Sequence, residues 1–334
     1  MSYIWYFGNS THTSNSYRRY LALLRIGCTV QIFDPFLSVK SWANKFSWKT
    51  GYRLVQSATK RWLVSQLEDL PLPDLIWVDS GEFFGVICLK FLKKFNVPIV
   101  LYNNDDPTGT RDGNRFRSLI QALPFYDLCV VMREINELEY QSYGARRTLR
   151  IWMSYDELVH KNFDLPLDSG KVTFIGTYRT ADNRDELLLN LIKADINIEV
   201  WGNCWERSSF YHVLSPYCYG EARGNQYSQI IQKSAISLGF LSSTNRDIHT
   251  RRSVEIPAAG GLLCAERTNE HQLLFEEGKE AVFWTTKFEC IETCKYLLDH
   301  PFEREKIRKA GMKKVRQIGV GNQDICHQIL TAIL

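Results

Sequence analysis

Short apolar runs alternate with longer amphipathic stretches through the first half of the chain. Apolar runs of this length are typical of strands buried on both faces of a parallel sheet, and the amphipathic stretches are typical of helices that cover it. Because strands that alternate with helices predict a parallel α/β sheet, we expect ligands to bind beyond the carboxyl ends of the strands. The expected strands are 3–7, 29–33, 75–78, 99–102 and 128–132, and the clearest expected helices are 15–25 and 52–67.

The same alternation restarts after an interruption between residues 155 and 170. The stretch 163–170 contains proline, glycine, serine and aspartate and is expected to be a linker. A chain of 334 residues is too long for one small core, so we expect two α/β domains, over residues 1–158 and 159–334. In the second half the expected strands are 172–175, 198–201, 217–219, 235–241, 262–265 and one near 283, and the expected helices are 185–193, 227–233, 271–278, 290–298, 303–315 and 324–333.

The composition is that of a soluble globular protein, with 45% hydrophobic and 23% charged residues. The formal net charge of +4 is small, so we expect no stable nucleic-acid partner. The nine cysteines form no C-x-x-C pair, which disfavours a zinc ribbon and points to a reducing cytosol, and Cys290 and Cys294 are expected to pack on one helix face. No basic leader precedes the first strand and no apolar run is long enough to span a bilayer, so a cytoplasmic protein is expected.

The residues with the richest chemistry gather between 242 and 270. There a polar, basic loop leads into a short helix with Pro257 in its first turn and Gly260 at its end, followed by the buried strand 262–265. A helix that begins after such a loop directs free N–H groups and a positive dipole end at a phosphate. Glu255 then lies in the first turn and is expected to bond a hydroxyl of the same ligand. The alternative is an ordinary helix with a solvated, charged face.

This stretch resembles the C-terminal motif of GT-B glycosyltransferases, in particular the spore-maturation-protein (CgeB-like) group and, more distantly, the retaining family-four enzymes. In that motif a Glu-x7-Glu pattern precedes a small-residue helix and a glycine turn. Glu255 matches the second acid, and Asp247 stands where the first glutamate is expected. The resemblance continues through residues 265–270, 275–281 and 296–301.

The resemblance implies two Rossmann-like domains that face each other across a cleft, with the donor mainly on the second domain and the acceptor mainly on the first. It also implies that the last helix returns to the N-terminal domain. The implied activity is transfer of a sugar from a nucleotide-diphosphate donor, with UDP or GDP as the nucleotide, without a cofactor and without an obligatory metal. The acceptor is open among a glycan, a lipid, a protein and a small molecule, and the expected location is the cytoplasm or the inner face of the membrane.

Without a metal, cationic side chains must stabilise the negative charge that develops on the leaving diphosphate. We expect Arg184 and Arg252 to bind the phosphates, with Arg179 as the alternative to Arg184, which resembles the basic residue that holds the diphosphate in this group. Glu255 is expected to bind the ribose hydroxyls. The full set of expected donor-binding residues is Gly176, Arg184, Gly202, Asn245, Arg246, Arg251, Arg252, Glu255 and Glu270.

The catalytic candidates are His12, Asp247 and His249. His12 lies in the first strand–helix loop, where it is either a base or sugar ligand facing the site or a solvated side chain, and Asp247 or His249 is expected to contact the donor sugar. Asp105 and Asp106 follow a strand as paired acids, but we interpret them as helix caps and expect no metal. Trp205 is interpreted either as an aromatic wall beside the base or as core.

Two other functions fit the same residues. A GT-B-like sugar-nucleotide epimerase uses the same donor site and needs no acceptor, and a non-catalytic module binds a phosphorylated partner or nucleic acid. A nicotinamide enzyme is disfavoured, because the first loop has one glycine, Gly8, where the dinucleotide fingerprint needs three.

Overall fold

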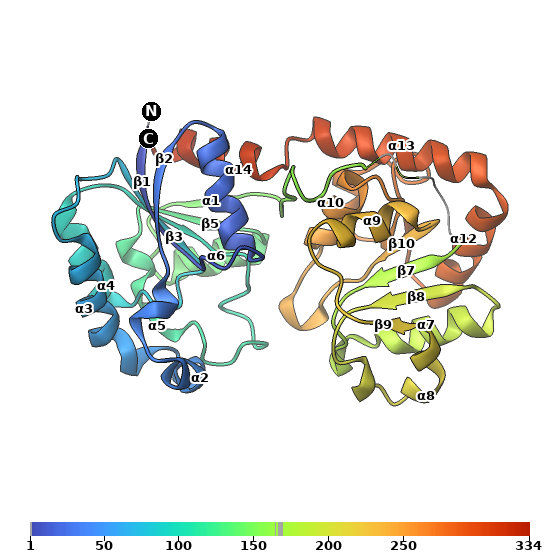
Figure 1. Ribbon diagram of the computed structural model, residues 1–334, viewed down its shortest axis with the longest axis horizontal. Coiled ribbons are helices and arrows are strands. Elements are labelled where there is room, and N and C mark those ends of the chain that lie inside the picture. Colours follow the sequence, from blue (N-terminus) through green and yellow to red (C-terminus); the bar gives the residue numbers. More distant parts are fainter. Residues whose placement is uncertain (1, 164, 166–169) are drawn as a thin grey trace. The chain divides into compact units, whose positions relative to one another are not determined.

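The computed structural model describes residues 2–163, 165 and 170–334. The chain forms two compact units, one of residues Met1–Trp152 with Asn322–Leu334 and the other of Met153–Gly321 (Figure 1). The chain crosses from the first unit to the second between residues 152 and 153 and crosses back between residues 321 and 322. The first crossing lies before the expected boundary at 158–159, and the second crossing was not placed in the expected domain bounds. The expected linker 163–170 falls mostly outside the described residues and within the span of the second unit.

The first unit contains a six-stranded sheet with the order β2-β1-β3-β4-β5-β6, in which every pairing is parallel. Its strands are β1 (Tyr3–Phe7), β2 (Thr29–Phe33), β3 (Leu75–Asp79), β4 (Ile99–Tyr102), β5 (Leu128–Val131) and β6 (Thr148–Arg150). Its helices are α1 (Asn15–Arg25), α2 (Ser41–Thr50), α3 (Gln56–Leu67), α4 (Val86–Leu92), α5 (Arg117–Ala122), α6 (Glu134–Ser142) and α14 (Asn322–Ile333). The five expected strands are confirmed, and the half-buried edge strand β6 and helix α2 are additional.

The second unit repeats this plan with the strand order β12-β11-β10-β7-β8-β9, again with parallel pairings throughout. Its strands are β7 (Val172–Ile175), β8 (Ile198–Trp201), β9 (Cys218–Tyr219), β10 (Ile236–Gly239), β11 (Leu263–Glu266) and β12 (Val282–Trp284). Its helices are α7 (Arg184–Lys193), α8 (Tyr211–Leu214), α9 (Asn225–Lys233), α10 (Arg251–Ala258), α11 (Asn269–Leu274), α12 (Lys287–Asp299) and α13 (Pro301–Gln317). Two parallel α/β domains, each with its own apolar core, are therefore confirmed.

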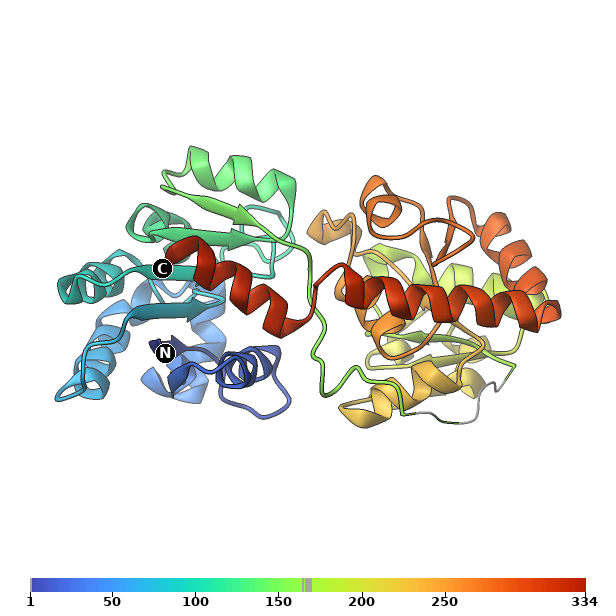
Figure 2. The ribbon, with the colours of Figure 1, turned by 90° about the horizontal axis from the view of Figure 1, so that it is seen from above.

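The last helix, α14, belongs to the first unit although it follows the whole second unit in sequence (Figure 2). It packs against α1, and Ile325, Cys326 and Ile329 on it are buried. The Arg147 guanidinium donates a 2.9 Å hydrogen bond to the carbonyl of Ala332 near the end of the helix. No described helix is both long and apolar enough to cross a membrane.

Helix α10 begins earlier than expected, at Arg251, because Thr250 caps it. The Thr250 side chain accepts from the backbone of Ser253, and the Ser253 hydroxyl accepts a 3.0 Å bond from the Thr250 N–H. Pro257 therefore lies near the end of the helix rather than in its first turn, which corrects that expectation. Gly260 ends the helix as expected, with φ +85° and a 2.9 Å bond from its N–H to the Pro257 carbonyl.

Candidate functional site

Two glycine turns meet at the carboxyl ends of β7 and β8. The N–H of Gly176 donates to the carbonyl of Trp201 at 2.7 Å, and the carbonyl of Gly176 accepts a 2.9 Å bond from the indole of Trp205. Gly202 has φ +136°, and a Cβ there would lie 2.3 Å from the Gly176 oxygen. Both turns thus depend on close backbone contact. Trp205 is buried beneath them, so it is a core residue rather than an aromatic wall beside the nucleobase.

Arg184 is the first residue of α7 and is buried at this strand edge. Its guanidinium donates to the carbonyls of Thr177 at 3.2 Å and Leu241 at 2.9 Å and forms a 2.7 Å ion pair with Asp182. Burial lowers the pKa of Arg184 to about 10, against the attraction of Asp182. The Nε of Arg184 has no hydrogen-bond partner among the described residues. The side chain is held rigidly and keeps one buried donor unsatisfied.

Arg252, in the first turn of α10, reaches the same place. Its Nε donates a 2.5 Å bond to the carbonyl of Ile175, and its Nη2 lies 3.3 Å from where a Cβ on Gly176 would be. The guanidinium carbons of Arg252 and Arg184 lie 6.0 and 5.7 Å from the centre of the Phe174 ring. Two fixed positive groups therefore flank the end of β7, which is the preorganised charge that an anionic ligand needs.

Glu255 lies in the second turn of α10, one turn later than expected, and is buried. Its Oε1 lies 2.8 Å from the Arg251 guanidinium and 3.7 Å from Nε2 of His160, and its Oε2 accepts a 2.9 Å bond from the hydroxyl of Tyr227. Burial alone would raise the pKa of Glu255, but Arg251, His160, Arg252 and the Tyr227 bond together lower it to about 2. The side chain is an ionised, oriented carboxylate and not part of a solvated face.

Tyr227 and His160 were not singled out from the sequence. Tyr227 opens the expected helix 227–233, and His160 falls in the interruption before the second set of strands. Their rings meet edge to face with centroids 5.5 Å apart. No spacing rule links either residue to Glu255, because the contact arises only when α9 packs beside α10.

The loop before α10 places Asn245, Arg246 and Asp247 together. It begins with a short 3-10 helix at Ser243–Asn245, and the amide of Asn245 donates a 3.1 Å bond to the Asp247 carboxylate. Arg246 adopts a left-handed conformation with φ +50°. Arg246 and Asp247 are half-buried, so Asp247 lies at a surface-accessible turn near the site arginines in sequence and stays a catalytic candidate.

His249 and Glu270, in contrast, are held inside the protein. His249 is 1% exposed, its Nε2 accepts a 3.0 Å bond from the Met153 N–H, and its Nδ1 lies 2.5 Å from a carboxylate oxygen of Glu270. Glu270 is buried as well. Both ring nitrogens have partners, and the pair joins the loop before α10 to α11. The expected contacts of His249 with the sugar and of Glu270 with the donor stay predictions.

In the first unit, the carboxyl ends of β1 and β3 surround a cavity of about 160 Å³. Asn9, Ser80, Gly81, Glu82 and Arg115 contribute to its lining. Asp79 also lines the cavity, and two buried side chains hold its carboxylate in place. It accepts a 2.7 Å bond from the Tyr6 hydroxyl and pairs at 2.8 Å with buried Arg19.

His12 follows β1 in the loop that precedes α1. Its ring is exposed and meets the Tyr17 ring edge to face, with centroids 4.5 Å apart. His12 is not among the residues that line the 160 Å³ cavity. The exposed position fits either interpretation of His12 equally, so its role stays a prediction.

The paired acids Asp105 and Asp106 are both engaged by neighbouring side chains. Asp105 pairs with Arg111 at 3.0 Å and Arg115 at 3.2 Å, and buried Asp106 accepts a 2.7 Å bond from Asn136. Within the described part of the chain, one group offers three metal-ligating atoms within 4.8 Å of one another, namely the thiols of Cys264, Cys290 and Cys294. These thiols are fully buried in the apolar core of the second unit, where Cys290 and Cys294 pack from α12 against β11.

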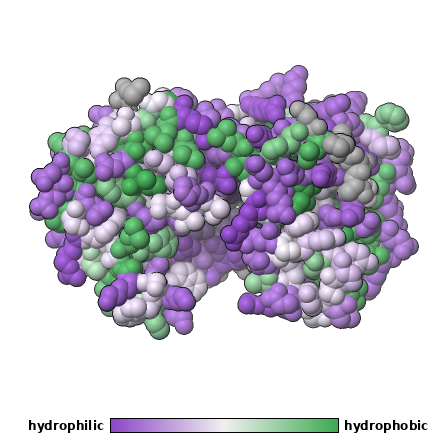
Figure 3. Space-filling model, in the orientation of Figure 1, coloured by the Kyte–Doolittle hydropathy of each residue, from purple (hydrophilic) through white to green (hydrophobic). Residues whose placement is uncertain are grey.

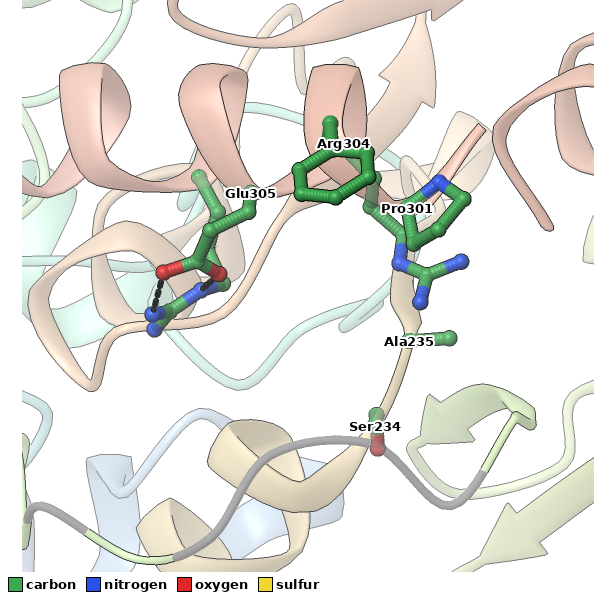
Figure 4. A pocket seen from close by; sticks show the side chains of 7 residues that line it. Ser234, Ala235, Pro301, Arg304 and Glu305 are labelled. Atoms are coloured by element: carbon green, nitrogen blue, oxygen red, sulfur yellow. Dashed lines mark hydrogen bonds and ion pairs between the residues drawn. The ribbon is translucent and has the colours of Figure 1, made fainter. Parts of the chain in front are cut away.

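A larger cavity of about 290 Å³ lies in the second unit beside the start of α13 (Figure 4). Ser234 and Ala235 in its lining precede β10, so it borders the amino end of that strand. The Arg308 and Glu305 side chains at its edge pair with each other at 2.6 Å. Ligands of parallel sheets bind at the opposite, carboxyl end. We therefore assign the candidate site to the carboxyl end of β7, where Arg184 and Arg252 lie.

Comparison with known proteins agrees with this fold. Residues 179–320 match the glycosyl transferase-like family. A sequence search of curated proteins finds no match. Sucrose-phosphate synthase from Thermosynechococcus elongatus superposes with a TM-score of 0.72 at 12% identity, over 99% of this chain and 98% of that chain.

Two further solved structures cover nearly the whole chain. Anabaena HepE in complex with UDP-glucose superposes with a TM-score of 0.69 at 13% identity, over 99% of both chains. AviGT4, a glycosyltransferase involved in avilamycin A biosynthesis, superposes with a TM-score of 0.60 at 10% identity, over 99% of this chain and 96% of that chain. The fold is therefore that of the GT-B glycosyltransferases, and the similarity to the glycosyl transferase-like family is confined to residues 179–320; the spore-maturation group and family four are not distinguished.

Proposed function

We propose that this protein transfers a sugar from a nucleotide-diphosphate donor to an acceptor, without a metal ion. The observation that carries the proposal is the pair of fixed guanidinium groups, Arg184 and Arg252, which both lie within 6.0 Å of the centre of the Phe174 ring at the end of β7. In glycosyl transfer the bond between the sugar and the diphosphate breaks, and a bond to an acceptor oxygen forms. The diphosphate takes up negative charge as it leaves, and the two arginines are placed to stabilise it.

Glu255 is the proposed partner of the ribose. It is one helical turn from Arg251 and already ionised, so it accepts hydrogen bonds from hydroxyl donors without first losing a proton. Each carboxylate oxygen accepts more than one bond, so the contacts with Tyr227 and Arg251 leave capacity for ribose hydroxyls. Asp247 is the proposed contact of the donor sugar.

UDP is the nucleotide that we propose first. The solved structures of HepE contain UDP, UDP with glucose, or UDP-glucose. The first-unit cavity with Asp79, Glu82 and Arg115 is the proposed acceptor region, since it lies at the carboxyl ends of the strands of that sheet. Its acidic and basic lining suits a hydroxyl-bearing acceptor.

A thermal-shift titration with UDP, GDP and UDP-glucose tests the donor site. A ligand that binds only the folded protein at a hundred times its Kd stabilises it by roughly 2.7 kcal/mol, and this raises the Tm. We expect UDP to raise the Tm equally with and without EDTA, and Arg252→Gln to weaken UDP binding by roughly ten- to a hundredfold, as loss of one charge-assisted contact does.

Arg207→Gln is the matched control, because Arg207 is an exposed arginine of the same unit. Arg179→Gln tests the alternative assignment. If Arg179→Gln weakens UDP binding while Arg252→Gln does not, the proposed diphosphate position is wrong. Incubation with UDP-glucose alone should give only slow hydrolysis, whereas an isomeric sugar nucleotide would identify an epimerase. Activity that EDTA abolishes and magnesium restores would contradict the metal-free mechanism.

A further inference from the structure

Helix α2 of the first unit turns apolar side chains toward the solvent. Of its 10 residues only Ser47 is buried. Trp42 and Phe46 are 64% and 65% exposed, and their spacing of four residues places them on one helix face. Leu37 before the helix and Leu54 after it are 75% and 82% exposed. The apolar side chains on this helix face are therefore mostly exposed to solvent, which is the reverse of an ordinary surface helix.

The segment that contains these apolar side chains is strongly basic. The chain between Asp34 and Glu68 contains no acidic residue. Its basic residues are Lys40, Lys45, Lys49, Arg53, Lys60 and Arg61, all exposed. These six charges exceed the net charge of +4 of the whole chain. The excess of positive charge is thus concentrated in the segment 35–67, which contains α2, whereas the remainder of the chain is close to neutral.

The C-terminal end of α2 is fixed to the body of the unit. Gly51 ends the helix with φ +65°, and a Cβ there would lie 2.3 Å from the carbonyl oxygen of Asn114. The Gly51 carbonyl accepts bonds from the N–H of Ser118 at 3.3 Å and from its hydroxyl at 2.5 Å. Because this junction is built from close backbone contacts, the exposed face of α2 is a defined surface rather than a loose loop.

A basic cavity adjoins the end of the helix. It has a volume of about 460 Å³ and is lined by Thr50, Arg53, Leu54, Asn114 and Arg117. Arg53 and Arg117 give it two positive groups beside the exposed apolar Leu54. A cavity of this composition suits a phosphate that is attached to an apolar chain, since arginine binds phosphate in a bidentate manner.

We propose that α2 and its neighbours form a docking surface for a membrane with anionic lipids. We name it the α2 surface, and it consists of Leu37, Trp42, Phe46, Trp48, Leu54, Lys40, Lys45, Lys49, Arg53 and Arg117. Aromatic side chains insert at the boundary of headgroups and acyl chains, and lysines beside them attract anionic headgroups. The cores of protein–protein interfaces are depleted in lysine, so lysines between exposed aromatic residues favour a lipid surface over a second protein.

Figure 1 shows α2 at one end of the first unit, and Figure 3 shows hydrophobic residues, in green, beside hydrophilic ones on the surface of that unit. The proposal does not depend on the proposed transferase activity, because attachment to lipid requires no nucleotide. It adds a place of action: a peripheral protein whose first unit, which carries the proposed acceptor cavity, is bound at a lipid surface.

Vesicle flotation tests the proposal with the full chain. We expect binding to vesicles of phosphatidylcholine mixed with phosphatidylglycerol, little binding to phosphatidylcholine alone, and release by salt. Each basic residue near an anionic surface contributes about 1 kcal/mol, so Lys45→Gln with Lys49→Gln should weaken binding roughly thirtyfold. Trp42→Ser with Phe46→Ser should weaken binding to the anionic vesicles as well, because it removes the inserted side chains.

The controls have the same chemistry in the second unit. Lys306→Gln with Lys313→Gln changes two exposed lysines, and Leu273→Ser with Phe288→Ser changes two side chains that are each 72% exposed. Both should bind as the wild type does. An unchanged Tm of the α2 variants shows that they fold. Absence of vesicle binding, equal binding to neutral vesicles, or α2 variants that bind like the wild type would overturn the proposal. So would a dimer in light scattering that Trp42→Ser with Phe46→Ser dissociates, since a second copy would then occupy the surface.

Discussion

At the scale of single residues, the candidate site depends on charges that the protein holds in place. Arg252 and Glu255 were singled out because they follow a basic loop and precede a glycine turn, which is a phosphate-binding pattern, and Arg184 was singled out because it resembles the basic residue that holds the diphosphate. His249 belongs to the same polar stretch but is buried against Glu270. A polar residue in a loop looks the same in sequence whether it points outward or into the protein, so burial of His249 was not predictable.

The Glu255 carboxylate links the site to stability. Its pKa falls from about 4.5 to about 2 in the folded protein, where burial is outweighed by Arg251, His160, Arg252 and Tyr227. Because the folded-state pKa is lowered, the stabilisation is present above about pH 4.5 and is lost as the pH falls toward 2. We expect the unfolding free energy to fall by roughly 2 kcal/mol between about pH 6 and pH 3 through this group alone.

Glu255→Gln removes that contribution. Urea unfolding of both proteins at several pH values measures it, and the variant should have the shallower dependence on pH. Glu199→Gln is the control, since Glu199 pairs with Lys171 at a partly exposed position of the same unit. Equal pH dependence of the wild type and Glu255→Gln would mean that Glu255 is not ionised and held as described.

At the scale of elements, the periodicity of the sequence predicted nearly every strand of both sheets. Largely buried strands such as β1 and β7 are short apolar runs with sharp ends, so their bounds were predicted well. Strand β6 was missed because it is an edge strand of three half-buried residues. Helix α2 was missed because its apolar residues face outward, and α10 began earlier than predicted because the Thr250–Ser253 capping box is not the usual Ser/Thr-x-x-Glu pattern.

Gly202 shows how the junction of two elements builds the site. Gly202→Ala places a Cβ 2.3 Å from the Gly176 oxygen, in a left-handed conformation that alanine disfavours. We expect a loss of at least roughly 2 kcal/mol of stability and weaker UDP binding, because the end of β7 must move. Gly220→Ala is the matched control, since a Cβ at Gly220 meets nothing within 4 Å. Chemical denaturation and UDP titration measure both effects, and equal behaviour of the two variants would contradict this account of the turn.

At the scale of the whole molecule, the chain completes its first unit only at its C-terminal end. Two domains were predicted from length and from the restart of the strand pattern, but the boundary was placed a few residues late. The crossing at 152–153 has no glycine or proline that would indicate a linker in the sequence. The residues on both sides of it, including Ile151 and Met153, are partly or fully buried and therefore resemble core residues. The expected linker 163–170 has the composition of a linker but lies away from both crossings.

Removal of residues 322–334 should therefore destabilise the first unit. Helix α14 buries Ile325 and Ile329 beside α1, and full burial of such side chains contributes about 1.5–3 kcal/mol each. That loss is a large part of the stability of a typical domain, which is about 5–15 kcal/mol. The second unit, Met153–Gly321, keeps its own core and all of the site arginines.

Calorimetry of the truncated chain should show a low-temperature transition that UDP does not shift and a second transition whose temperature UDP raises. Deletion of exposed Leu334 alone is the control and should leave the melting profile unchanged. A truncated chain that melts in one transition at the wild-type temperature would show that α14 is dispensable and that the first unit is stable without it.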